Sequence, residues 1–139
     1  MDQTDFFFNI AVDLKHHGFS KQHENAMYAV YKACKAIREP RRYGDSIHSI
    51  AATVILQDYD SKFHRPYVRY NPDSKEVEAK VKVDWEQVLK SGLRETAAIY
   101  EAAIVQVLEE MKEEAPDFDF DKLKRDLHKA IQEEIGMVE

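Results

Sequence analysis

The sequence has few of the residues from which metal, disulfide and nucleotide sites are usually built. Cys34 is the single cysteine among 139 residues, so an internal disulfide and any paired-cysteine metal motif are excluded. The four glycines lie far apart, at positions 18, 44, 92 and 136, and no glycine-rich loop is therefore present to hold a phosphate group. No HExxH motif and no nucleophile elbow occurs either. From these absences we expect no enzymatic activity, no cofactor and no resident metal.

Long apolar runs are also lacking. No segment reaches the roughly 20 apolar residues that a helix needs to cross a bilayer. The first five residues are acidic where a secretory signal would be basic, and a single cysteine fits a reducing compartment. We therefore expect a cytoplasmic protein without membrane contact.

The length suffices for one domain with its own core, and we expect residues 1–139 to form it.

The negative charge lies mainly near the C-terminus. The chain has a formal net charge of −6, and residues 101–139 hold 12 acidic and five basic side chains. Phosphate binding requires the opposite sign, so this excess argues against nucleic acid as a ligand. It suits a basic protein partner through electrostatic steering. The alternative is an ordinary solvated helix face.

Polar and apolar residues alternate without interruption over residues 75–83. The apolar members are Val77, Ala79, Val81 and Val83. This alternation predicts a strand with one buried and one solvated face. Three further strands are expected, over residues 6–14, 47–59 and 65–70.

The composition of two of these segments indicates their place in a sheet. The segment 47–59 is apolar on both faces, which is typical of a central strand. Pro66 cannot donate a backbone hydrogen bond, so either the segment that contains it lies at an edge of the sheet or Pro66 lies at the start of the strand. Residues 71–74 have the composition of a type I turn, which predicts a hairpin between the last two strands.

Three other segments repeat apolar residues at three- and four-residue steps, which predicts amphipathic helices. The residues expected to cap their N-termini are Ser20, Asp84 and Asp119. The first helix is expected to run to about Arg38, and the second to be interrupted at Ser91-Gly92. Gly136 suits the C-cap of the last helix.

The elements therefore follow the order β-α-β-β-β-α-α, and the fold class is α+β. Because the strands are mostly amphipathic, we expect a four-stranded, mostly antiparallel sheet with helices packed on one face. The strand order stays open, since the first crossover could make its two strands parallel neighbours or separate them.

The histidines and the cysteine have simpler explanations than a functional site. His16, His17 and His23 lie near Glu24 and could hold zinc, but their spacing does not place two ligands one helical turn apart. Surface histidines at a helix start are the favoured interpretation. Cys34 falls on an apolar helix stripe, where a thiol is a small buried hydrophobe rather than a nucleophile.

Asp58 and Asp60 support an alternative function. With nearby histidines they could serve a small enzyme or a ligand-binding domain, as an acid and base pair or as cation ligands. Two aspartates that flank a tyrosine are also ordinary turn formers.

Three features together resemble a known family. They are the alternating strand that runs into Val-Asp-Trp (83–85), the Asp-Phe-Asp-Phe-Asp-Lys-Leu opening (117–123) of the last helix, and Tyr-Gly-Asp-Ser-Ile (43–47) before the central strand. In this order they resemble the immunity protein 44 family of bacterial polymorphic toxin systems. The resemblance implies a non-enzymatic, intracellular protein that binds a cognate toxin and blocks it, in the setting of interbacterial competition. A basic nuclease is one toxin that an acidic surface would mask.

The resemblance transfers no binding residues, so the contact surface is predicted from physical criteria. A tight inhibitor needs aromatic or arginine anchors ringed by polar groups. The candidates on the loop and hairpin are Asp58, Tyr59, Asp60, Tyr67 and Arg69, and those on the acidic helix surface are Glu109, Glu110, Glu113 and Glu114. We expect a monomer or a weak homodimer. A homodimer through the exposed sheet face or an edge strand is a third interpretation of the chain.

Overall fold

The structure is a computed structural model. It describes residues 6–12, 18–37, 50–58, 66–71, 73–74, 76–113 and 119–138, and for residues 6–9, 50, 51 and 58 it describes the backbone. The elements are β1 (Phe6–Val12), α1 (Lys21–Ala36), β2 (Ile50–Asp58), β3 (Tyr67–Asn71), β4 (Glu76–Val83), α2 (Trp85–Lys90), α3 (Leu93–Met111) and α4 (Phe120–Val138). The expected α+β class and the order of the strands and helices along the chain are confirmed, with the second expected helix divided into α2 and α3.

The four strands form one mixed sheet in the order β1-β2-β4-β3. β1 pairs with β2 in parallel, β2 pairs with β4 in parallel, and β3 pairs with β4 in antiparallel. The expectation of a mostly antiparallel sheet is therefore wrong. α1 connects β1 to β2, which are parallel neighbours in the sheet. β3 lies at the sheet edge on one side of β4, and β2 pairs with the other side of β4 in the same direction. The central place of β2 and the edge place of β3 are confirmed.

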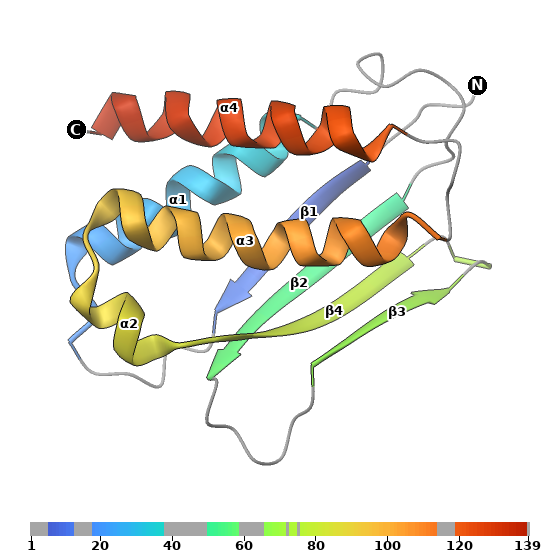
Figure 1. Ribbon diagram of the computed structural model, residues 1–139, viewed down its shortest axis with the longest axis horizontal. Coiled ribbons are helices and arrows are strands. Elements are labelled where there is room, and N and C mark those ends of the chain that lie inside the picture. Colours follow the sequence, from blue (N-terminus) through green and yellow to red (C-terminus); the bar gives the residue numbers. More distant parts are fainter. Residues whose placement is uncertain are drawn as a thin grey trace.

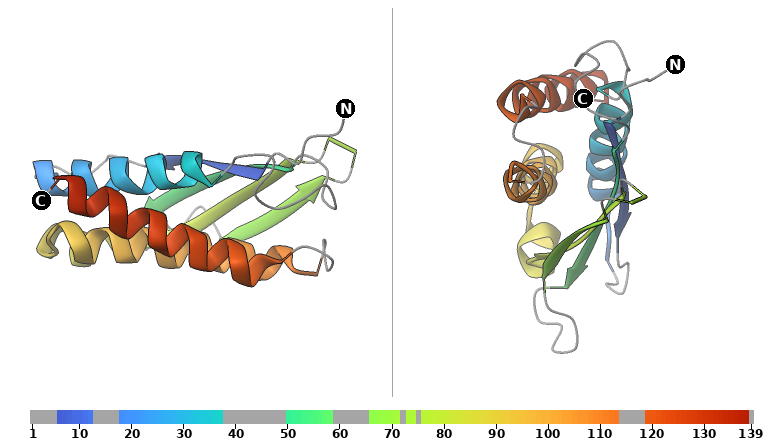
Figure 2. Two further views of the ribbon diagram at one scale, coloured as in Figure 1. Left: turned by 90° about the horizontal axis from the view of Figure 1, so that it is seen from above. Right: turned by 90° about the vertical axis from the view of Figure 1, so that its right-hand side faces the viewer.

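The helices leave one face of the sheet open. α3 packs against β2, β4 and β3, α1 packs against β1, and α4 packs against α1 and α3. In Figure 1 the strands run behind α3, and the two views of Figure 2 show α1 alongside the β1 edge. No helix covers the opposite face of the sheet in the part of the chain that the structure describes.

The alternation predicted for β4 is confirmed. Val77, Ala79, Val81 and Val83 are at most 4% exposed, and their neighbours Glu76 and Glu78 are exposed. On β2, the side chains of Ala52, Val54 and Leu56 are buried on the same face. Burying this apolar face under α3 is the main driving force for joining the sheet to the helices.

The predicted helix starts are confirmed by their caps. The side chain of Ser20 accepts from the His23 backbone N–H, and Asp84 accepts from that of Gln87 at 3.2 Å. Asp119 accepts from the Lys122 N–H at 2.9 Å. These contacts satisfy backbone donors that have no partner within a helix.

Two helix boundaries were predicted from the sequence, one at Ser91-Gly92 and one at Gly136. The interruption at Ser91-Gly92 is confirmed, because α2 ends at Lys90 and α3 begins at Leu93. The expectation that Gly136 caps the end of the last helix is wrong, because α4 continues to Val138. One interior glycine costs about 1 kcal/mol relative to alanine, and buried Ile135 beside it holds this turn against the core.

A chain of aromatic contacts links the junction of β4 and α2 to two other helices. Trp85 is 1% exposed. Its ring lies edge-on to Phe19, before α1, with centroids 5.9 Å apart, and edge-on to Tyr100 of α3 at 6.4 Å. The tryptophan of the Val-Asp-Trp motif is therefore a packing anchor where β4, α1 and α3 meet.

Candidate partner-binding surface

β3 carries two of the predicted contact residues, Tyr67 and Arg69. It lies at the edge of the sheet, and none of its side chains is fully buried. Tyr67 is paired with Lys80 and Arg69 with Glu78 across the β3–β4 ladder, which places all four on the open face. Val68 and Tyr70 are opposite Ala79 and Val77, and therefore face the helices. The strand thus presents two different surfaces at one edge.

On the open face, Tyr67 is held by its neighbours. Its hydroxyl donates a hydrogen bond to the Glu78 carboxylate, which raises the pKa of Tyr67. The Arg69 guanidinium carbon lies 4.3 Å from the ring centroid, and the Lys80 Nζ lies 5.7 Å from it. Exposed cation–π contacts of this kind contribute about 0.5–1 kcal/mol, and with the hydrogen bond they favour this position of the ring. Tyrosine and arginine are two of the residue types enriched among the hot-spot residues of protein interfaces.

On the other side of β3, a pocket of about 250 Å³ separates the strand from the C-terminal end of α3. The residues that line it are Val68, Tyr70, Glu110, Met111 and Glu113. Met111 is 2% exposed, whereas Glu110 and Glu113 are exposed. The pocket therefore combines apolar walls with a carboxylate rim.

Glu109 has a different environment from the two glutamates at the pocket. It forms ion pairs with Lys124 and with Lys112, the latter at 3.2 Å. The Nζ atoms of Lys112 and Lys124 lie 3.1 and 3.3 Å, respectively, from the carboxylate of Asp121 in α4. These contacts lower the pKa of Glu109 and of Asp121. Glu109 thus serves the contact between α3 and α4, and its charge is balanced by lysines.

The remaining predicted contact residues are not placed together. Asp58 ends β2, where it is paired with Val83 of β4. Tyr59, Asp60 and Glu114 lie outside the described residues. The structure therefore unites Tyr67 and Arg69 on one surface and Glu110 and Glu113 on another, and it separates Glu109 from both.

The histidine predictions have mixed outcomes. His23 is 3% exposed and takes part in a cap, so it is not the surface histidine that was expected. His16 and His17 lie outside the described residues. Among the residues that are described, no group of histidine, cysteine and carboxylate side chains could hold a metal ion. Cys34 is buried, as predicted, and burial raises its pKa to about 12.

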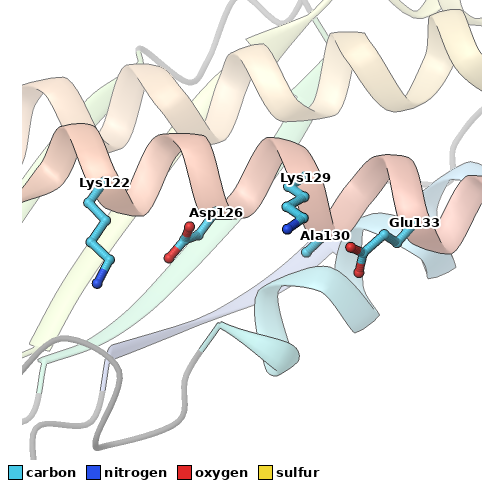
Figure 3. A pocket seen from close by; sticks show the side chains of 5 residues that line it. All are labelled: Lys122, Asp126, Lys129, Ala130 and Glu133. Carbon is cyan, nitrogen blue, oxygen red and sulfur yellow. The ribbon is translucent and has the colours of Figure 1, made fainter.

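A second pocket, of about 200 Å³, lies along α4. Figure 3 shows its residues projecting from the same side of that helix: Lys122, Asp126, Lys129, Ala130 and Glu133. The two lysines balance the two carboxylates, and the charges alternate at three- and four-residue steps. Such alternation is typical of a solvated helix surface, and it gives this pocket no preference for a ligand of either sign.

The pocket between β3 and α3 could be predicted from the sequence only in part. Alternation along β3 places Val68 and Tyr70 on the face opposite Tyr67. No local pattern shows that the end of α3 lies against that face, because the contact joins segments about 40 residues apart in the chain.

Among the described helices, none is long and apolar enough to span a bilayer.

Comparison with known proteins adds one match. A family model described as immunity protein 44 matches residues 4–133. Neither the curated proteins nor the solved structures gave a match. The matched range includes β3, the pocket beside it and all of the strands and helices up to the last turn of α4.

Proposed function

Because the chain belongs to the immunity protein 44 family, we propose that it binds a cognate bacterial toxin and neutralises it by covering the toxin's active surface. The family match over residues 4–133 is the observation that carries this proposal. In this role the protein acts as an inhibitor without catalysis, inside cells that compete with their neighbours through polymorphic toxins.

The β3 edge of the open face is the contact surface that the side chains support best. Tyr67 supplies a large aromatic area, and the exposed Arg69 lies against it with a guanidinium group that can donate to a partner's carboxylate or carbonyl groups. Thr53, Glu78 and Lys82 form a polar surround on β2 and β4. An aromatic and arginine anchor inside a polar rim is the usual arrangement of a protein-binding hot spot.

The charge of the protein supports a basic toxin. The net charge is −6, so long-range attraction speeds association with a positive surface. Nucleases carry such a surface, because they must bind phosphate groups. We therefore propose a basic nuclease as the toxin, with its phosphate-binding surface covered in the complex.

The proposal is tested with the toxin domain encoded beside the gene for this chain. Co-expression should rescue cells that produce the toxin, and the two proteins should co-purify. If the neighbouring product is not toxic, or if expression of this chain protects no cell from it, the proposal is wrong.

A pair of variants tests the surface. Tyr67→Ala should weaken toxin binding by about 30-fold or more, since truncated hot-spot residues cost about 2 kcal/mol or more. Tyr28→Ala is the matched control, because Tyr28 is 55% exposed on α1 and also lies under a lysine, with the Lys32 Nζ 4.9 Å from its ring centroid. Equal effects of the two variants in a calorimetric titration would exclude the open face at β3 as the contact.

A further inference from the structure

We propose that an extended basic segment of the partner adds to the outer edge of β3, along which no described element lies, and places a lysine or arginine side chain in the pocket between β3 and the end of α3. This inference rests on the proposed function, and it specifies how the toxin is recognised. Three observations on the described residues carry it: the outer edge of β3, the composition of the pocket, and the charge at the pocket rim.

The first observation is the edge of the sheet. β3 pairs with β4 on one side, and no described element lies along its other side. Figure 1 shows β3 as the outermost strand, whereas α1 runs beside β1 at the opposite edge. An edge strand presents unpaired N–H and C=O groups to which an extended peptide can add. The β1 edge is less accessible, because α1 packs against it.

The second observation is the match between the pocket and a long cationic side chain. Val68, Tyr70 and Met111 supply apolar walls, and Glu110 and Glu113 supply carboxylates at the rim. Lysine and arginine have an aliphatic stem that packs on apolar surface and a charged end that seeks an anion. A volume of about 250 Å³ has room for one such side chain. A neutral apolar side chain would give the carboxylates no partner beyond the described residues.

The third observation is that the rim carboxylates are available. Glu110 and Glu113 have no ion pair with any described residue, in contrast to Glu109, whose charge is balanced by two lysines. A partner's cation therefore gains an interaction that no described residue already satisfies.

A partner segment added to β3 would contact both this pocket and the open face of the sheet. Side chains of a segment added to β3 would point in turn to the two faces of the sheet. One set would lie over Tyr67 and Arg69, and the other would lie toward Val68, Tyr70 and the glutamates. One segment would thus use both surfaces of β3.

A second copy of this chain fits the edge less well. Each copy carries a net charge of −6 and would bring its own Glu110 and Glu113 to the same strand. Like charges brought together oppose association. Charge complementarity therefore selects a basic partner.

The test compares two double variants that remove the same charge. Glu110→Gln/Glu113→Gln neutralises the pocket rim, and Glu86→Gln/Glu133→Gln neutralises two exposed glutamates on α2 and α4. Binding to the purified toxin domain is measured by calorimetry at 50 and 300 mM salt. The rim variant should bind 10- to 100-fold more weakly at low salt and lose part of the salt dependence, because it lacks local ion pairs. The control should stay within about threefold of the unmodified protein.

The outcomes separate this inference from the proposed function. If the unmodified protein does not bind the toxin, both are wrong. If it binds and the rim variant matches the control, the inference alone is wrong. Amide hydrogen exchange gives a second measurement, in which the β3 amides should gain protection on toxin binding. Protection of β3 without toxin, together with a dimer that the rim variant strengthens, would assign the edge to a second copy and overturn the inference.

Discussion

His23 of α1 and Ser91, at the break between α2 and α3, are joined by a hydrogen bond of 3.0 Å between Nε2 and the carbonyl oxygen. The backbone N–H of Ser20 donates to the other ring nitrogen, Nδ1, at 2.9 Å. Because a backbone N–H only donates, Nδ1 accepts and Nε2 carries the proton. One buried imidazole thus completes the cap of α1 and ties it to a segment 68 residues away.

This contact predicts a stability loss on substitution of His23. His23→Ala should lower the free energy of unfolding by about 2–3 kcal/mol, since a cap and a long-range hydrogen bond are both removed. His23→Gln should lose about half as much, because glutamine is a usual capping-box partner for the Ser20 N–H but is too short to reach Ser91 as well. Urea unfolding followed by circular dichroism measures both values. Equal losses in the two variants would contradict the capping role.

Substitution of Tyr100 is expected to increase stability, in contrast to substitution of His23. Its side chain is 0% exposed, and its hydroxyl has no hydrogen-bond partner among the described residues. Burial raises its pKa, and an unsatisfied buried hydroxyl costs free energy. Tyr100→Phe should therefore raise the free energy of unfolding, by up to about 1 kcal/mol. Exposed Tyr28→Phe is the control and should change nothing measurable. A loss of stability in Tyr100→Phe would show that the hydroxyl is satisfied, for example by a buried water.

Cys34 should resist thiol reagents in the folded protein. It is 0% exposed, and burial raises its pKa to about 12. At pH 8 its thiolate fraction should be lowered by about a thousandfold relative to an exposed cysteine. Reaction with Ellman's reagent should therefore occur only on the timescale of unfolding, and promptly in 8 M urea. Fast labelling without denaturant would contradict this placement.

The ion pairs between α3 and α4 predict a loss of stability in acid. Contacts with Lys124 and Lys112 lower the pKa of Glu109 and Asp121 in the folded state. The unfolded chain then binds protons at higher pH than the folded one, so this contribution is present at neutral pH and is lost below about pH 4. Because the groups are exposed, the effect should be small and should weaken in 1 M salt.

Carboxyl chemical shifts in an NMR titration measure this prediction directly. In Lys124→Met the pKa of Glu109 and of Asp121 should both rise toward their ordinary values. Lys32→Met, which removes a lysine beside Tyr28 on α1, should leave both unchanged. Ordinary values for Glu109 and Asp121 in the unmodified protein would exclude the ion-pair network.

Features set by local chemistry could be predicted from the sequence. The alternation in residues 76–83 and the apolar stripe of α4 each reflect one buried face, and Ser20, Asp84 and Asp119 cap helices because their side chains reach backbone donors nearby. In each case the interacting residues lie within a few positions of one another.

Features set by distant partners could not be predicted in this way. Alternation is the same in parallel and antiparallel strands, so it did not reveal that β4 pairs in parallel with β2. The histidine at position 23 looked like a surface residue because Ser91, its distant acceptor, is invisible in the local pattern. For the same reason the sequence indicated acidic residues at the end of α3 without showing that two of them face a pocket beside β3.

The partial burial of β3 has a consequence for redesign of the proposed contact surface. Each of its five side chains is exposed or half-buried, whereas β4 buries every second residue completely. Replacing residues 67–71 should therefore disturb folding far less than equivalent changes in β4. A library of variants restricted to this strand would give a means of retargeting the scaffold to toxins that the parent chain does not bind.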